Sequence, residues 1–210
     1  MKKLFGGAGK NGSGKSTAFK ILADRLIKRG FTAKIFTSSG LVLPILQKMG
    51  LNGSREDFNA AVLATDKERG KDWLAKEMCA IMLDSPEQIS IWDGTRRHID
   101  FATVHEEEEF SSQLFGYIDA DEAVRYERAK KRGEKANEAI MSLAQFQKED
   151  RLETNGEIEG LPRNLEANNN LDLVNLESEM ALWVARMELI GFFDWCACGL
   201  SVAERGRFFI

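Results

Sequence analysis

Gly9-Lys10-Asn11-Gly12-Ser13-Gly14-Lys15-Ser16-Thr17 is the stretch that decides the fold of this chain. It fits the P-loop pattern G-x-x-x-x-G-K-[ST], whose glycines let the backbone curl until several N–H groups point at one polyphosphate. Lys15 is expected to reach the terminal phosphates, and the Ser16 hydroxyl is expected to bind Mg²⁺. The predicted nucleotide-binding residues of this stretch are Gly9, Asn11, Gly12, Ser13, Gly14, Lys15, Ser16 and Thr17.

The residues on either side of the loop meet the structural context that the pattern requires. Leu4-Phe5 predicts a short buried strand before the loop. After the loop, Phe19, Leu22 and Leu26 recur at helical spacing, which predicts an amphipathic helix that ends near Arg29-Gly30. This context favours a nucleoside triphosphate site over a glycine-rich turn that matches by accident.

The composition indicates one compact α/β domain, because the 210 residues are 43% hydrophobic and 30% charged. The net charge is −4, from 29 basic and 33 acidic residues, which argues against a nucleic-acid groove. No stretch approaches the roughly 18 apolar residues of a membrane span. Three cysteines are too few for a disulfide framework, so we expect a reduced, cytoplasmic protein that binds neither nucleic acid nor membrane.

Strands and helices are expected to alternate along the rest of the chain. Further strands are predicted at residues 31–36, 89–93, 114–118 and 171–174. Further helices are predicted at residues 41–49, 55–65, 72–83, 122–132 and 177–189. Alternation with long connections predicts a parallel sheet with helices on both faces, and ligands then bind beyond the carboxyl ends of the strands.

The carboxyl ends of the predicted strands carry a second group of polar residues. Asp93 follows an apolar strand, where it is expected either to bind the metal, directly or through water, or to orient an attacking hydroxyl and accept its proton. The alternative is a carboxylate that only caps the turn at Gly94. Arg96 is our preferred ligand for a second phosphate, because arginine binds phosphate through two N–H groups; Arg97 is expected to lie on the surface or to pair with Asp93.

The helix predicted at 122–132 carries Arg125, Arg128 and Arg132 on one side. Arg128 and Arg132 are expected to swing onto the transferring phosphoryl group, where positive charge stabilises the transition state. The alternative is an exposed basic helix face, and the sequence leaves both open.

The order of these motifs resembles that of the P-loop nucleoside monophosphate kinases. The resemblance rests on the P-loop, on Ser54-Arg55-Glu56-Asp57-Phe58, on Asp93-Gly94-x-Arg96, on residues 117–133 and on Leu171-Asp-Leu-Val174-Asn175. It is strongest to the branch of dephospho-CoA kinase and the deoxynucleoside and cytidine monophosphate kinases. It covers roughly residues 3–190.

This resemblance implies a three-layer α/β/α domain at residues 1–190 with a five-stranded parallel sheet. It also implies a small helical acceptor-binding insert at about 38–85 and a lid at about 133–153. ATP and Mg²⁺ are expected at Lys15 and Ser16, with Asp93 as the second metal-binding residue. The remaining roles that it implies are acceptor contacts at Ser38, Arg55 and Arg96, charge stabilisation by Arg128, Arg132 and Arg151, and an adenine-side loop around Asn175.

The tail at residues 191–210 lies outside the resemblance. Its aromatic residues suggest docking on the domain or on a second subunit, which makes a homodimer through the tail one prediction.

The preferred function is ATP-dependent phosphoryl transfer to a nucleoside or deoxynucleoside monophosphate. The alternative acceptor is dephospho-CoA, whose ribose hydroxyl would make a base role for Asp93 more important. A nucleotide-hydrolysing switch or ATPase is the alternative from another class, and a fold that binds nucleotide without turnover is a third. The sequence lacks an Asn-Lys-x-Asp motif, and Gly94 stands where a motor ATPase usually has a second acid. Both features favour the kinase.

Overall fold

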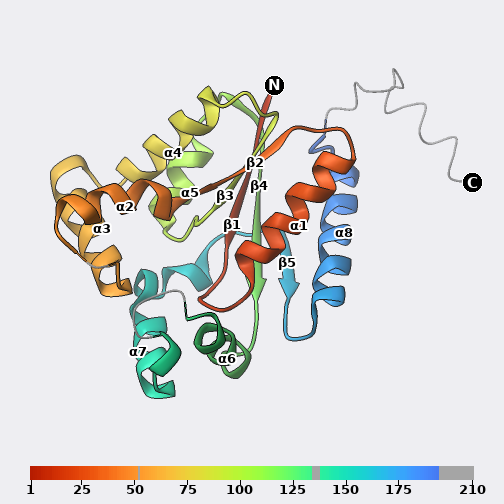
Figure 1. Cartoon of the computed structure of the whole chain (residues 1–210). Helices are drawn as coiled ribbons and strands as arrows, with labels where there is room; N and C mark the ends of the chain where they lie inside the picture. The colour runs from red at the N-terminus through yellow and green to blue at the C-terminus, as the bar shows by residue number, and fades with distance from the viewer. Residues whose placement is uncertain (52, 134–137, 194–210) are drawn as a thin grey trace, which may run out of the picture.

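The computed structural model describes residues 1–51, 53–133 and 138–193, without the side chains of residues 55, 138 and 152–156. Its five parallel strands form one sheet in the order β2-β3-β1-β4-β5 (Figure 1). The strands are β1 (Lys2–Ala8), β2 (Ala33–Thr37), β3 (Ile89–Asp93), β4 (Phe110–Asp119) and β5 (Leu165–Asn168).

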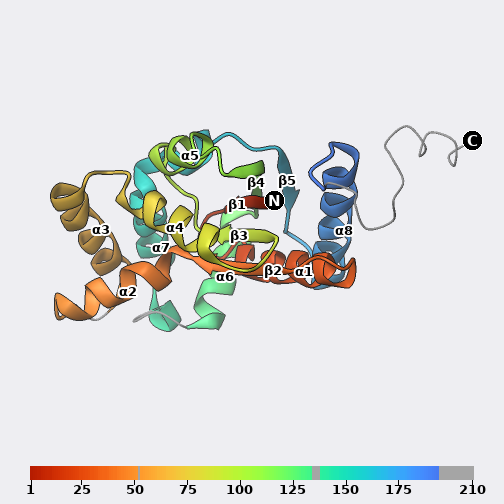
Figure 2. The ribbon, with the colours of Figure 1, turned by 90° about the horizontal axis from the view of Figure 1, so that it is seen from above.

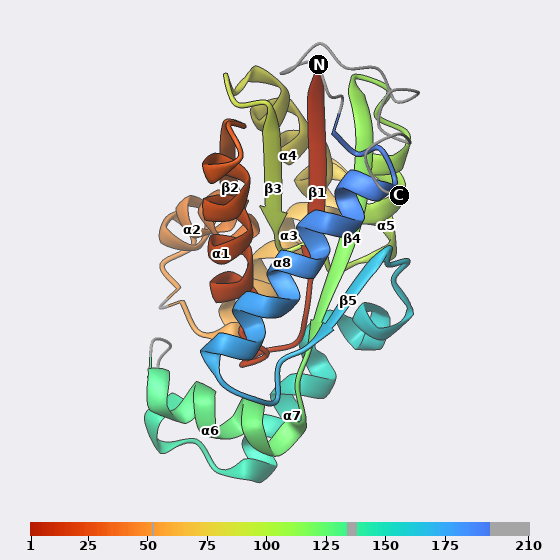
Figure 3. The ribbon, with the colours of Figure 1, turned by 90° about the vertical axis from the view of Figure 1, so that its right-hand side faces the viewer.

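Helices connect the strands and extend beyond them at one end of the sheet. The α-helices are α1 (Lys15–Lys28), α2 (Ser38–Lys48), α3 (Arg55–Arg69), α4 (Trp73–Asp84), α5 (His98–His105), α6 (Glu122–Arg132), α7 (Leu143–Leu152) and α8 (Leu173–Leu189). Two 3₁₀ segments, η1 (Glu138–Ile140) and η2 (Glu153–Gly160), flank α7. Figure 3 shows α6 and α7 beyond the carboxyl ends of the strands.

The expected three-layer α/β/α architecture is confirmed. Helices α1 and α8 cover one face of the sheet, and α4 and α5 cover the other (Figures 1 and 3). The adjacent residues Leu4 and Phe5 of β1 are both fully buried, and they enter the two different apolar clusters because successive side chains of a strand point to opposite faces. The core therefore lies on both sides of β1.

Strand β1 is longer than the two residues predicted, because it continues through Gly6 and Gly7 to Ala8. These glycines are required by close packing rather than by a turn. A Cβ on Gly7 would overlap the ring of Phe19 from α1, and a Cβ on Gly116 of β4 would overlap Phe5 and Trp183. The sheet can approach α1 and α8 closely only because glycine stands at these positions.

Helices α2, α3 and α4 form a small unit with its own apolar cluster, built around Val42, Leu46, Ala61, Trp73 and Leu74. The view from above shows α3 at the end of the molecule opposite α8 (Figure 2). These helices occupy the segment predicted as the acceptor-binding insert. Helix α7 occupies the predicted lid segment, and its Phe146 packs against Ala129 of α6 together with Met141, which precedes the helix. The functional roles of both segments stay predictions.

The prediction of the last strand at residues 171–174 is wrong. Strand β5 is Leu165–Asn168, where buried Leu165 and Ala167 alternate with exposed residues. Residues 173 onward are helical, because the Asp172 side chain caps α8 by accepting a hydrogen bond from the Asn175 N–H. Leu171 is 66% exposed, so the apolar residues that suggested a strand do not enter the core.

The first aromatic residues of the tail dock on the domain, which is one of the two outcomes expected. Phe192 and Phe193 are buried in the cluster under α1 and α8, and the Phe193 ring stacks on Phe31 at 4.7 Å between centroids. Trp195, Phe208 and Phe209 lie outside the described residues. Within the part that the structure describes, no helix is both long enough and apolar enough to cross a membrane.

Candidate active site

The register of the sheet brings Asp93 to the P-loop. Strands β1 and β3 are parallel neighbours in which Gly7 pairs with Asp93, and the Gly94 N–H donates to the Gly7 carbonyl at 3.1 Å. The P-loop starts two residues after Gly7. The two segments are therefore adjacent at the carboxyl rim of the sheet, as the sequence predicted.

Two P-loop side chains bind the Asp93 carboxylate directly. Lys15 Nζ donates to Asp93 Oδ1 at 2.6 Å, and Ser16 Oγ donates to Asp93 Oδ2 at 2.7 Å. Asp93 is 7% exposed. Lys15 and Ser16 open α1, directly after Gly14, whose φ of 86° is a left-handed conformation that suits glycine.

The environment of Asp93 keeps it ionised. Burial would raise the pKa of this carboxyl, but the charge and hydrogen bond of Lys15, the hydrogen bond of Ser16 and the charge of Arg96 outweigh burial and lower its pKa below the ordinary value. A lowered pKa makes Asp93 a weak proton acceptor at neutral pH. It suits a carboxylate that orients a cation or a hydroxyl.

The residues at this corner fit Mg²⁺. Ser16 Oγ and the Asp93 carboxylate are hard oxygen ligands within hydrogen-bonding distance of each other. Mg²⁺ typically takes one or two protein oxygens and completes its shell with water and substrate phosphates. Among the described residues no group of three or more His, Cys, Asp or Glu side chains could hold a metal ion. A metal at Ser16 and Asp93 would therefore depend on the phosphates of a bound nucleotide, whose charge it would neutralise.

The outer part of the P-loop rests on α6. Asn11 is 9% exposed, and its Oδ1 accepts a hydrogen bond from Arg132 Nη2 at 3.1 Å. The Asn11 carbonyl accepts a hydrogen bond from Arg125 Nη1 at 3.2 Å. Gly12 lies so close to the helix that a Cβ there would overlap the Arg125 carbonyl. Lys10 forms an ion pair with Glu159 of η2.

Arg128 and Asn169 form the other side of the loop. Asn169 Nδ2 donates to the Ser13 carbonyl at 2.7 Å, and Arg128 donates to the carbonyls of Asn169 at 2.7 Å and Leu171 at 3.0 Å. Asn175 instead lies in the first turn of α8, where its amide donates to Asp172 Oδ1. The segment after β5 that lies against the P-loop is thus centred on Asn169, which the sequence analysis missed because it placed the strand too late. The run Asn168-Asn169-Asn170 was the available signal.

The residues predicted to contact the acceptor lie near the same rim or outside the described side chains. Ser38 Oγ accepts a hydrogen bond from Trp92 Nε1 at 2.9 Å and donates to the Gly94 carbonyl at 3.2 Å. Arg96 is partly exposed, and its charge acts on Asp93. Arg55 opens α3, but its side chain lies outside the described part of the chain.

Arg97 belongs to a different, structural group. It donates to both oxygens of Asp66 in α3 at 3.1 Å and to Asp100 Oδ1 at 2.7 Å. Trp73 Nε1 of α4 also donates to Asp66, at 2.9 Å. Arg97 therefore ties the helical insert to the start of α5, and it pairs with Asp66 and Asp100 rather than with Asp93.

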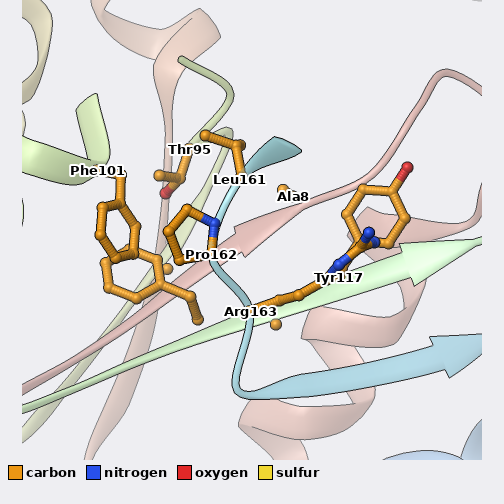
Figure 4. A pocket seen from close by; sticks show the side chains of 10 residues that line it. Ala8, Thr95, Phe101, Tyr117, Leu161, Pro162 and Arg163 are labelled. Atoms are coloured by element: carbon orange, nitrogen blue, oxygen red, sulfur yellow. The ribbon is translucent and has the colours of Figure 1, made fainter. Parts of the chain in front are cut away.

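A small pocket lies on the face of the sheet opposite α1 (Figure 4). Its lining residues are Gly6, Ala8, Thr95, Phe101, Phe115, Gly116, Tyr117, Leu161, Pro162 and Arg163. Thr95 is 1% exposed, and its hydroxyl has no hydrogen-bond partner among the described residues. The Arg163 guanidinium stacks over the Tyr117 ring, and burial raises the pKa of that phenol to about 12, so it stays protonated. The pocket adjoins the rim through Ala8 and Thr95.

Comparison with known proteins agrees with this geometry at the level of fold. No protein-family model matches the sequence, and no curated protein matches it. Solved structures do match. The structure of the Mycobacterium tuberculosis APS kinase in complex with AMPPNP and APS gives a TM-score of 0.55 at 15% identity, over 89% of this chain and 98% of that chain.

Two further solved structures give similar values. A gluconokinase from Sinorhizobium meliloti gives a TM-score of 0.51 at 18% identity, over 90% of this chain and 96% of that one. A protein from Thermus thermophilus gives a TM-score of 0.57 at 14% identity, over 90% of this chain and 98% of that chain. The chain therefore has the fold of the P-loop kinases.

Proposed function

We propose that this chain transfers a phosphoryl group from ATP to a small acceptor that carries a phosphate of its own. The observation that carries the proposal is the convergence of Lys15 and Ser16 on Asp93, at 2.6 and 2.7 Å, where the P-loop meets the end of β3. A P-loop with a buried carboxylate on its lysine and serine is the donor half of a phosphoryl-transfer site.

The donor half works by positioning and by charge neutralisation. The N–H groups of the P-loop hold the phosphates at the N-terminus of α1. Lys15 gives up its hydrogen bond to Asp93 and binds the phosphate oxygens instead. Ser16 and Asp93 would hold Mg²⁺, which would supply positive charge at the phosphates. Arg132 donates a hydrogen bond to Asn11, and Arg128 lies near Gly14, so both can add positive charge at the edges of the loop.

The acceptor half is built around Arg96. Its neighbour Arg97 pairs with Asp66 and Asp100, whereas the charge of Arg96 acts on Asp93 at the rim, so we assign Arg96 to the acceptor phosphate. We propose a nucleoside or deoxynucleoside monophosphate as the acceptor, with its phosphate bound by Arg96. With dephospho-CoA as the acceptor, Asp93 would orient the attacking ribose hydroxyl.

A kinase must also keep water from the transferring group. Helix α7 stands beyond the strand ends beside α6, where a lid can cover the site. A nucleotide-hydrolysing switch or ATPase has no need of a second phosphate site at Arg96. A kinase therefore explains Arg96 as well as the P-loop, whereas a hydrolase explains the P-loop alone.

The test is a coupled assay of ADP release over a panel of nucleoside monophosphates, deoxynucleoside monophosphates and dephospho-CoA. ADP release that depends on one class of acceptor supports the kinase and names the acceptor. Equal ADP release without any acceptor would instead establish a hydrolase. Binding of AMPPNP without turnover on any member of the panel would indicate a nucleotide-binding protein.

A further inference from the structure

A buried ion pair joins helix α7 to helix α6 beside the P-loop. Arg125 of α6 donates to Asp150 of α7 through both ends of its guanidinium, at 2.6 Å and 2.9 Å. The exposed fraction of the two side chains is 4% and 8%. This bidentate ion pair has a well-defined geometry, because two parallel hydrogen bonds fix the plane of the guanidinium.

The same guanidinium also binds the P-loop backbone. Arg125 Nη1 donates to the Asn11 carbonyl at 3.2 Å, and Nε donates to the Ala120 carbonyl at 3.0 Å. The ring of Phe146 lies 5.5 Å from the guanidinium and packs it from α7. The buried guanidinium of Arg125 thus pairs with a carboxylate of α7 and also donates a hydrogen bond to the P-loop.

The contact to Asn11 fixes the direction of a phosphate-binding group. The peptide between Asn11 and Gly12 is planar and trans, so its carbonyl and its N–H point in opposite directions. Because Arg125 holds the Asn11 carbonyl toward α6, the Gly12 N–H points away from α6. The N–H groups of the P-loop must converge on the phosphates from that other side.

From these contacts we propose that the Arg125–Asp150 pair is a positioning device that couples the lid helix to nucleotide affinity through the Asn11–Gly12 peptide. The proposal rests on the proposed function, because it assumes that the P-loop binds a nucleoside triphosphate. Removing the Asp150 charge leaves a buried guanidinium without its counter-charge, which must then seek water or another acceptor and so loosen its hold on Asn11. Coupling between two sites is reciprocal, so bound nucleotide must also hold α7 more firmly.

The test is titration of the full chain with AMPPNP and Mg²⁺ by calorimetry. Asp150→Asn is expected to raise the Kd for AMPPNP about tenfold or more. The helix α7 is expected to stay in place in this variant, because Phe146 still packs against Ala129 and Met141. Arg125→Lys keeps the positive charge but cannot form the bidentate pair with Asp150, so it should raise the Kd for AMPPNP by a smaller factor. With the acceptor identified, the KM for ATP should rise in Asp150→Asn while the KM for the acceptor stays near its original value.

Asp66→Asn is the matched control. It removes the carboxylate of another ion pair, Arg97–Asp66, whose side chains are 16% and 12% exposed, but this pair lies at the helical insert. Its Kd for AMPPNP should stay within about twofold of the unaltered protein, even where its thermal stability falls as far as that of Asp150→Asn.

The outcomes separate the two proposals. An unchanged Kd in both Asp150→Asn and Arg125→Lys would overturn the coupling alone. An equal loss of affinity in Asp66→Asn would also overturn it, because the effect would then follow general stability. Failure of the unaltered protein to bind AMPPNP would overturn the proposed function and the coupling that rests on it. Protection of α7 from proteolysis by AMPPNP in the unaltered protein, and its loss in Asp150→Asn, would support the coupling independently of turnover.

Discussion

Lys15 Nζ lies 2.6 Å from Asp93 Oδ1, although 78 residues separate the two along the chain. The lysine proposed to bind phosphate is thus paired with the acid proposed to hold the metal. In the proposed mechanism a bound phosphate would compete with Asp93 for Lys15, and a cation beside Asp93 would make that exchange easier by replacing the lost positive charge.

Lys15→Ala tests this exchange. The variant should lower the rate of ADP release by about 100-fold or more, because a charge that stabilises the transferring phosphates is removed from the site. Lys28→Ala removes an exposed lysine from the last turn of the same helix and should leave the rate unchanged. Near-normal turnover in Lys15→Ala would contradict the mechanism.

The adjacent residues Arg96 and Arg97 should behave differently when each is changed to alanine. Arg96→Ala should raise the KM for the acceptor about tenfold or more and leave the KM for ATP near its original value, because Arg96 is the proposed ligand of the acceptor phosphate. Arg97→Ala should lower the unfolding free energy by about 3 kcal/mol, since it leaves the buried Asp100 and the half-buried Asp66 without their cation. Steady-state kinetics and urea unfolding of both variants check this. A rise in the KM for ATP alone would show that Arg96 is misassigned.

The pH dependence of stability should reveal the ionised state of Asp93. Its pKa is lowered in the folded chain, so its charge stabilises the fold at pH values above the ordinary pKa of an aspartate, and this contribution is lost as the pH falls through the lower, folded value. The difference in unfolding free energy between the unaltered protein and Asp93→Asn should therefore be constant above about pH 5 and shrink below about pH 4. Urea unfolding at a series of pH values measures it. A difference that grew on acidification would mean that burial dominates and that the pKa is raised.

Gly116→Ala tests the close approach of the sheet to α8. The added methyl group would overlap Phe5 and Trp183, so the unfolding free energy should fall by about 2 kcal/mol or more. Gly40→Ala is the matched control, because Gly40 lies within α2 and a Cβ there meets only Thr37 Oγ1 at 3.4 Å. That variant should be neutral or more stable by about 0.5 kcal/mol, from helix propensity. Equal stabilities would refute the packing argument.

Phe193→Ala tests the docking of the tail on the domain. Phe193 is 3% exposed and stacks on Phe31, so its truncation should lower the unfolding free energy by about 3 kcal/mol. Leu189→Ala, four residues earlier and 86% exposed, should change it by less than about 0.5 kcal/mol. If both variants were as stable as the unaltered protein, Phe193 would not be part of the core in solution.

The sequence predicted the strands and helices well where their signals are local. The helix at 122–132 and the strand at 89–93 have the expected bounds, because capping residues and short apolar runs mark them. The last strand was misplaced, because Leu171 and Val174 form an apolar run that only the structure shows to be exposed. Helix α5 was not predicted at all. Its position depends on Asp100, whose carboxylate binds Arg97 at the start of the helix.

The sequence by itself determined the P-loop, since its donors come from consecutive residues, and it placed Asp93 at the same rim. Only the tertiary structure decided which of the other charged residues act together. Asp66 and Asp150 look alike as acids in polar segments, yet one binds Arg97 at the insert and the other binds Arg125 at the P-loop. The physical reason is that an ion pair depends on distance in space, and packing of α3 and α7 sets that distance between segments far apart in the chain.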